Sequence, residues 1–283
     1  MPEPTFRLGF NTNGFAHHRL DDALRIIAEL GYRAVALTPD ANHLPPDRTS
    51  SAELRAMRRL LDELGLVVVV ETGARYVLDP RRKQRPTLLE ADAAERARRF
   101  DFLVRCAEIS VELGGETVSL WSGIPALAIR REDAWEHLVD GVVRLCARLA
   151  PMGVQVAFEP EPGMLVETLA EWERLRDAAS APNFGLALDV GHVPCTESIT
   201  AGDAIRRYGP SLRTVHLDDS RGGVHEHLQI GDGELDWADV MLALREVGFA
   251  GIASVELSRH SHAAPVAAGR AIERLRAAIT ATR

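Results

Sequence analysis

The sequence predicts an α/β protein in which eight parallel strands, each followed by a helix, close into a (β/α)8 TIM barrel. Two observations predict this fold class. Short β-branched or apolar runs recur along the chain, and each is followed by a segment with apolar residues at helical spacing. The length of 283 residues suits one such barrel, so we expect a single domain over residues 1–283. An open doubly wound sheet has a similar content, but no Gly-x-Gly-x-x-Gly sequence follows the first strand.

Eight segments have the composition of buried strands. In chain order they are residues 7–11, 34–38, 66–71, 117–121, 154–159, 184–189, 214–217 and 252–256. Apolar stripes with a helical period lie between them, and the clearest are at 20–30, 54–64 and 138–149. These stripes predict helices that pack on the outside of the barrel.

The ends of several helices are also marked in the sequence. Ser50 with Glu53, and Thr168 with Glu171, form capping-box patterns that predict helix starts. Glycines that end a helix in the left-handed conformation are expected before four of the strands, at Gly31, Gly65, Gly114 and Gly248. Together these signals give a weak internal repeat of roughly 30 residues, as consecutive strand–helix units require.

The composition argues against several partners and locations. A formal net charge of −8 disfavours nucleic acid, whose backbone repels an acidic surface. No apolar run approaches the roughly 20 residues of a membrane span, and the first four residues lack the features of a secretory signal. We therefore expect a cytoplasmic protein with neither a nucleic acid nor a membrane partner, while a homo-oligomer is left open. The odd number of cysteines implies no disulfide framework: Cys106, Cys146 and Cys195.

Each of the last four predicted strands has, at or beside its end, a residue type that commonly binds metals. These residues are Glu159, Asp189, His216 and Glu256. In an α/β barrel the C-terminal ends of the strands converge on one mouth, so side chains far apart in sequence meet there. Three carboxylates and one imidazole favour Mn²⁺, with Mg²⁺, Co²⁺ or Zn²⁺ as alternatives, because hard oxygen donors dominate. A single acid at a strand end is usually a loop residue or a helix cap, and the prediction depends on all four.

A second group of polar residues lies beside the first. His192 follows Asp189 at a spacing of three, and His225 and His227 lie in the loop after His216. These histidines suit contacts to substrate hydroxyls, proton relay or a second metal ion, and a histidine-rich surface loop is the alternative.

The segment 73–89 is long enough to form a lid over the mouth. Its positive charge suits a phosphate or carboxylate, although a solvated basic loop has the same composition. The four cations concerned are Arg81, Arg82, Lys83 and Arg85.

Five stretches of the chain resemble the xylose isomerase-like barrel superfamily. The likeness is to its sugar phosphate isomerase/epimerase branch, which is related to ketose 3-epimerases, hydroxypyruvate isomerase, inosose dehydratase and endonuclease IV. It extends over nearly the whole chain. The stretches that carry it are 158–163, 188–192, 215–219, 227–236 and 254–256.

The resemblance implies roles for individual residues. Glu159, Asp189, His216 and Glu256 match the ligands of one divalent metal, the two glutamates match the acid and base, and His192 matches a substrate contact. The implied reaction is isomerisation or epimerisation of a sugar, keto-acid or cyclitol by proton transfer through a metal-stabilised enediolate. Further side chains are candidate contacts to the polyol substrate, with packing as the alternative role: His225, His227, Trp121, Glu161, Arg221, Trp237, Asn11 and Asn13.

Three other functions remain as alternatives. A lyase similar to inosose dehydratase uses related metal geometry to expel a hydroxyl group. A phosphodiesterase similar to endonuclease IV needs three zinc ions; His192, His225 and His227 match the ligands of one, but the third and fourth expected strands end without the required histidines, at Glu71 and Trp121. A barrel that binds a polyol without catalysis is the third alternative.

Overall fold

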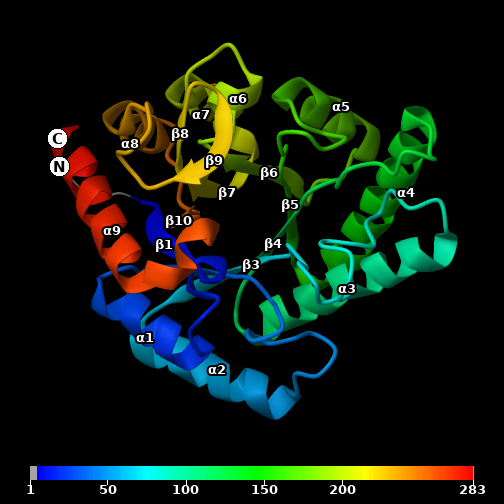
Figure 1. Cartoon of the computed structure of the whole chain (residues 1–283), viewed down its shortest axis with the longest axis horizontal. Coiled ribbons are helices and arrows are strands. Elements are labelled where there is room, and N and C mark those ends of the chain that lie inside the picture. The colour runs from blue at the N-terminus through cyan, green and yellow to red at the C-terminus, as the bar shows by residue number, and fades with distance from the viewer. Residues whose placement is uncertain (1–4, 283) are drawn as a thin grey trace.

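The structure, a computed structural model, describes residues 5–282 and contains a closed barrel of eight parallel strands. Figure 1 shows the helices wrapped around it. The order of strands around the barrel is β1-β10-β7-β6-β5-β4-β3-β2, and the predicted fold class is confirmed. The barrel strands are β1 (Arg7–Asn11), β2 (Ala34–Leu37), β3 (Val67–Glu71), β4 (Thr117–Leu120), β5 (Gln155–Phe158), β6 (Phe184–Asp189), β7 (Leu212–Leu217) and β10 (Ile252–Val255).

Nine α-helices and four 3₁₀ turns connect these strands within the described residues. The helices are α1 (Leu20–Glu29), α2 (Ser51–Leu64), α3 (Ala93–Glu112), α4 (Arg131–Leu149), α5 (Leu169–Ala179), α6 (Val193–Thr196), α7 (Ala201–Tyr208), α8 (Trp237–Glu246) and α9 (Ala264–Ala281). The 3₁₀ turns are η1 (Thr12–Phe15), η2 (Ala150–Met152), η3 (Gly209–Ser211) and η4 (Ser258–Ala263). No helix among residues 5–282 combines the length and the apolar character that a membrane crossing requires.

The predicted helix signals are present in the structure. Ser50 and Glu53 exchange the two hydrogen bonds of a capping box at the start of α2, and Thr168 and Glu171 do the same for α5. Gly65 ends α2 with φ of 64°. This is left-handed backbone, which glycine adopts without steric cost.

The strand register brings the ends of neighbouring strands to one level. Asp189 of β6 stands beside His216 of β7 in the parallel ladder. Glu159 and Glu256 each follow the last residue of a strand, and their backbone amides continue the ladder: Glu159 donates to Leu120 at 2.8 Å and Glu256 to Leu217 at 3.0 Å. The backbone at the mouth is therefore held by sheet hydrogen bonds rather than by loops.

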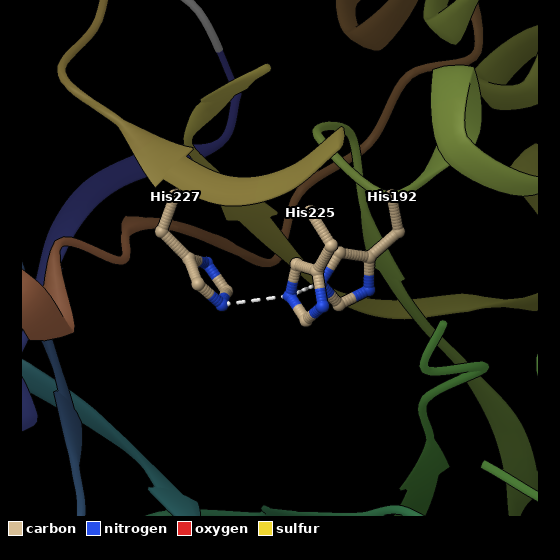
Figure 2. A group of neighbouring side chains, drawn as sticks. All are labelled: His192, His225 and His227. Atoms are coloured by element: carbon tan, nitrogen blue, oxygen red, sulfur yellow. Dashed lines mark hydrogen bonds between the residues drawn. The ribbon is translucent and has the colours of Figure 1, made fainter. Parts of the chain in front are cut away.

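A hairpin of two antiparallel strands, β8 (Asp219–Arg221) and β9 (Val224–Leu228), follows β7. It appears as the yellow arrow above the barrel in Figure 1. Gly222 and Gly223 form its turn with φ values of 59° and 70°, the conformation that a tight two-residue hairpin turn requires. In β9, the rings of His225 and His227 lie on the same side of the strand, as Figure 2 shows, although the backbone at His227 is left-handed with φ of 49° and the ladder register shifts here.

Asp219 fastens this hairpin to the chain that follows it. Its buried carboxylate accepts hydrogen bonds from the amides of Gly231 at 2.8 Å and Leu235 at 3.2 Å, and from the indole N–H of Trp237 at 2.9 Å. The amide of Ser220 donates to the same carboxylate at 3.0 Å. A buried carboxylate with four donors offsets the cost of leaving water and orders the segment. Trp237 therefore has a structural contact at the start of α8.

Candidate active site and metal centre

A cavity of about 550 Å³ opens at the C-terminal ends of the barrel strands. Its walls come from the residues that end or follow β1, β3, β4, β5 and β10, together with the hairpin. A cavity of this size lies in the range of small-molecule sites. Its ionisable lining includes Glu71, Glu159, Glu161, His225, His227 and Glu256.

The structure brings together the four side chains that the sequence singled out as metal ligands. One ligand atom from each of Glu159, Asp189, His216 and Glu256 lies within 4.8 Å of the others. Glu159, Asp189 and His216 are buried, with exposed fractions of 5%, 1% and 1%, and Glu256 is half-buried at the cavity wall. Four donors at this spacing are near enough to share one ion.

The bonding of Asp189 fits a metal at this place. Its Oδ1 accepts a hydrogen bond from the amide of Gly191 at 2.7 Å, whereas Oδ2 is buried and has no hydrogen-bond partner among the described residues. The Nε2 atom of His192 lies 3.5 Å from Oδ2 as an ion pair. A buried carboxylate oxygen without a hydrogen bond is costly unless another group binds it. Burial opposes ionisation, but the charges of His192, His227 and His216 hold the pKa of Asp189 below its ordinary value, so the carboxylate is ionised.

His216 lies between carboxylates on both sides of its ring. Its Nδ1 is 2.9 Å from Glu159 Oε1 and 3.4 Å from Glu256 Oε2, and its Nε2 is 3.0 Å from Glu71 Oε1. Burial lowers the pKa of this imidazole, but Glu71 and Glu159 outweigh that effect and hold it well above the ordinary value. The ring therefore carries a proton on each side when only protein groups surround it.

The two glutamates predicted to act as acid and base are in different environments. Burial raises the pKa of Glu159 to about 7, although the nearby charge of His216 opposes this shift. Glu256 is less buried, and its Oε1 accepts a hydrogen bond of 2.7 Å from the side-chain amide of Asn13. Both carboxylates line the cavity, so both are accessible to a ligand there.

Three histidines converge beside this group, as Figure 2 shows. The Nε2 atom of His225 lies 3.0 Å from that of His192 and 2.9 Å from that of His227. On the far side of the cluster, His192 Nδ1 is 3.2 Å from the carbonyl oxygen of Pro160, and His227 Nδ1 forms an ion pair with Asp218. Three ring nitrogens thus face one another, in an arrangement that suits hydrogen bonds to a ligand or a metal ion.

The charges within this cluster are divided unequally. Burial together with the positive charges of His192 and His227 lowers the pKa of His225 to about 4. Burial also disfavours the charged forms of the other two rings, but Asp189 raises the pKa of His192 to about 9, and the contact with Asp218 raises that of His227 to about 10. The neutral ring therefore sits between two charged ones. His225 and His227 line the cavity, whereas His192 is buried behind them.

The remaining predicted substrate contacts differ in position. Glu161 and Trp121 line the cavity, but Arg99 lies over the ring of Trp121 at 4.8 Å and covers one of its faces. Arg221 is exposed on the hairpin, and its guanidinium donates a hydrogen bond to the carbonyl of Asp232. It is not among the described residues that form the cavity wall. A substrate contact by Arg221 stays a prediction. Asn13 reaches both the cavity and Glu256.

The basic segment 73–89 borders the cavity on one side, where Lys83 is part of the wall. Two of its other cations hold the segment in place: Arg82 forms ion pairs with Asp79 at 2.5 Å and Glu95 at 2.6 Å, and Arg85 pairs with Glu90 at 2.7 Å. Two of the four cations in this segment are thus neutralised by carboxylates around them. Closure of the segment over a ligand stays a prediction.

Two acidic residues at the site were not singled out by the sequence analysis. Glu71 ends β3 and contacts His216, and Asp218 follows β7 and contacts His227. Each stands at a strand end, which is the signal that identified the four candidate ligands. Asp218 and Asp219 are adjacent aspartates, and only the structure shows that the first contacts His227 while the second bonds the loop backbone.

Comparison with known proteins supports the family resemblance. Residues 24–278 match the family described as xylose isomerase-like TIM barrel. The chain is 24% identical over 238 residues to D-psicose 3-epimerase of Agrobacterium fabrum, covering 81% of this chain and 76% of that enzyme. It is 27% identical over 146 residues to inosose dehydratase of Lacticaseibacillus casei, a match that covers 44% of this chain and 47% of that enzyme.

Solved structures with the same fold cover almost the whole chain. A structure of IolI protein with a bound zinc atom superimposes with a TM-score of 0.79 at 19% identity, over 98% of this chain and 99% of that one. A structure of L-ribulose 3-epimerase gives a TM-score of 0.78 at 20% identity, over 98% and 96% of the two chains. At these identities the likeness of structures shows a common fold. Because the family match spans most of the sequence, the chain belongs to the xylose isomerase-like TIM barrel family.

Proposed function

We propose that this protein is a divalent-metal-dependent isomerase or epimerase of a keto-sugar, keto-acid or cyclitol, which moves a proton at the carbon beside a carbonyl. The observation that carries the proposal is the convergence of Glu159, Asp189, His216 and Glu256 within 4.8 Å, at the wall of a cavity that suits a small polyol. The name of one relative, D-psicose 3-epimerase, agrees with it.

The four side chains fit one divalent cation, because three carboxylates and an imidazole supply a mainly hard donor set that suits Mn²⁺ best. Such an ion supplies Lewis-acid stabilisation of the negative charge that develops on a substrate carbonyl oxygen. The buried Oδ2 of Asp189, which lacks a hydrogen-bond partner among residues 5–282, supports this assignment.

Glu159 and Glu256 are the proposed acid and base. They follow β5 and β10, strands three places apart around the barrel, and therefore reach the cavity from different directions. One carboxylate removes the proton from the carbon beside the carbonyl, and the other returns a proton to the opposite face or to the neighbouring carbon. Asn13 holds one oxygen of Glu256, which fixes the direction of the other.

The polyol contacts in this proposal come from the other side of the cavity. His225 and His227 present ring nitrogens to a ligand, Glu161 presents a carboxylate, and Trp121 offers the ring face that Arg99 leaves free. His192 acts from behind through its hydrogen bond to His225.

Solvent deuterium tests the proposed reaction most directly. The purified protein, loaded with Mn²⁺, is incubated in deuterium oxide with a panel of ketoses, keto-acids and inososes. We expect one deuterium to enter the substrate at the carbon beside the carbonyl, with product and substrate otherwise equal in mass. Uptake of deuterium before net conversion establishes the proton transfer, and a panel in which no compound exchanges with the metal-loaded protein contradicts the proposal.

A lyase is the second candidate, favoured by the match to inosose dehydratase. The same panel separates the two functions, because dehydration lowers the product mass by one water and isomerisation conserves it.

The three-histidine cluster in Figure 2 favours a further alternative, hydrolysis of a phosphodiester with more than one metal ion. Metal analysis of the purified protein distinguishes this hydrolase from the proposed isomerase or epimerase. Our proposal expects one ion per chain, and two or more ions with cleavage of an abasic duplex would favour the hydrolase.

A further inference from the structure

Glu71 is a buried carboxylate at the site with no part in the proposed proton transfer. It is the last residue of β3, its side chain is 8% exposed, and its Oε1 lies 3.0 Å from Nε2 of His216. Its other oxygen accepts a hydrogen bond from the hydroxyl of Ser119, which is its in-register neighbour on β4. Both oxygens of Glu71 thus have partners within the protein.

The contact between Glu71 and His216 crosses the barrel. β3 and β7 are four places apart in the closed order of eight strands, so the two residues approach from opposite sides of the mouth. The hydrogen bond from Ser119 fixes the carboxylate on one side, and the parallel ladder beside Asp189 fixes His216 on the other. A carboxylate held in this way determines the direction of the imidazole that it contacts.

An imidazole can bind a metal through only one nitrogen at a time at a single site, and that nitrogen must be free of its proton. In His216 the candidate is Nδ1, because it faces Glu159 and Glu256. A hydrogen bond from Nε2–H to Glu71 keeps the remaining proton on Nε2 and leaves the Nδ1 lone pair for the ion. The carboxylate also makes the imidazole a stronger electron donor.

We propose that Glu71 is a positioning residue that sets the tautomer and orientation of His216 and thereby increases the affinity of the site for its metal. The inference rests on the proposed metal site but does not depend on which reaction follows. Glu71 is not itself one of the four converging ligands, since His216 and Ser119 occupy its two oxygens. Its role is exerted through His216.

Metal affinity, measured without any substrate, tests the inference. Glu71→Ala is expected to weaken binding of Mn²⁺ or Zn²⁺ by roughly 10- to 100-fold in competition with a chromophoric chelator, the range typical for loss of such a partner. The metal affinity of Glu71→Gln is expected to lie between those of Glu71→Ala and the wild type, because the glutamine amide oxygen still accepts the hydrogen bond but carries no charge. Glu71→Gln also serves if the alanine variant does not fold.

The matched control is Asp40→Asn. Asp40 is a half-buried carboxylate at the same end of the barrel, and its ion pair is with Arg75 rather than with any of the four ligands. We expect the control to bind metal within about twofold of the wild type. If Asp40→Asn weakens binding as much as Glu71→Gln, a general loss of negative charge explains both and the inference is overturned.

A spectroscopic readout separates positioning from a purely structural role. In the Zn²⁺-loaded wild type, long-range ¹H–¹⁵N correlation of the histidine rings should show His216 protonated at Nε2, and Glu71→Ala should broaden or shift that signal. An unchanged ring signal together with unchanged metal affinity overturns the inference. Metal affinity that depends on Glu71 in a protein that exchanges no substrate deuterium overturns the proposed function instead, and leaves the role of Glu71 standing.

Discussion

The chemistry of individual residues at the mouth depends on how each carboxylate is paired. Asp189 keeps one oxygen without a hydrogen-bond partner among residues 5–282, Glu159 shares a proton with His216, and Glu256 is held by Asn13. Burial makes each of these arrangements expensive unless a ligand completes it. The site is therefore built from groups that compensate one another, and changing one of them should change its partners as well.

Replacing the proposed acid and base tests the role of each residue. Glu159→Gln and Glu256→Gln should each lower the rate of deuterium exchange by about 10² to 10⁴, since the amide retains the shape but cannot take up the proton. The rate is compared at equal metal content, which is measured on the same samples. Glu136→Gln on the exposed side of α4 is the control. Exchange that persists at the wild-type rate in both site variants would remove these glutamates from the reaction.

At the level of elements, the β8–β9 hairpin carries two of the cavity histidines, and Asp219 fixes it to the segment before α8. His225 and His227 of this hairpin both line the cavity. The direction of the whole hairpin thus decides which ring nitrogens reach the ligand. A change in its anchoring should affect ligand binding although it leaves both histidines in place.

Asp219→Ala should destabilise the protein by about 3 kcal/mol, because four donors lose a buried charged acceptor. It should also raise KM more than it lowers kcat, since the histidines that it positions are the proposed substrate contacts. Denaturant unfolding and steady-state kinetics measure the two effects. The control is Glu226→Gln, since Glu226 is a half-buried carboxylate of the same hairpin. This substitution should leave both the free energy of unfolding and KM close to the wild-type values. A stable Asp219→Ala variant with wild-type KM would contradict the anchoring role.

At the level of the whole molecule, the four candidate ligands connect the ends of β5, β6, β7 and β10. An ion that binds them only in the folded protein raises the free energy of unfolding by mass action, by about 2.7 kcal/mol at a concentration of 100 times Kd. Mn²⁺ should therefore raise Tm by roughly 5 to 10 °C relative to chelated protein. Differential scanning calorimetry measures the shift, and Asp189→Asn should reduce it. Equal Tm values with and without metal would contradict a site shared by four strands.

The fold was predictable from the sequence because each strand–helix unit carries its own local signals. Capping boxes at Ser50 and Thr168 and the glycine at Gly65 fix helix ends through contacts between near neighbours in the chain. The ends of the strands were predicted within about a residue for the same reason, and Glu159 and Glu256 proved to lie just beyond β5 and β10.

Contacts across the barrel were not predictable in the same way. Glu71 ends its strand just as Asp189 does, but its partner His216 lies 145 positions away in the chain. Only the closed order of the strands places them opposite each other. Arg221 was the converse case: it lies near the cavity histidines in sequence, but it follows the hairpin outward to Asp232. Proximity along the chain did not predict which side of the hairpin the Arg221 side chain would lie on.

The pairing of β10 with β1 closes the barrel and has a consequence for synthesis on the ribosome. The four converging donors lie between positions 159 and 256, so a nascent chain that has emerged only as far as β7 has its first three donors but lacks Glu256 and the closing strand. Completion of the donor set and closure of the barrel then happen in one step. Cation capture by the growing polypeptide should therefore come only after Glu256 and β10 have left the exit tunnel.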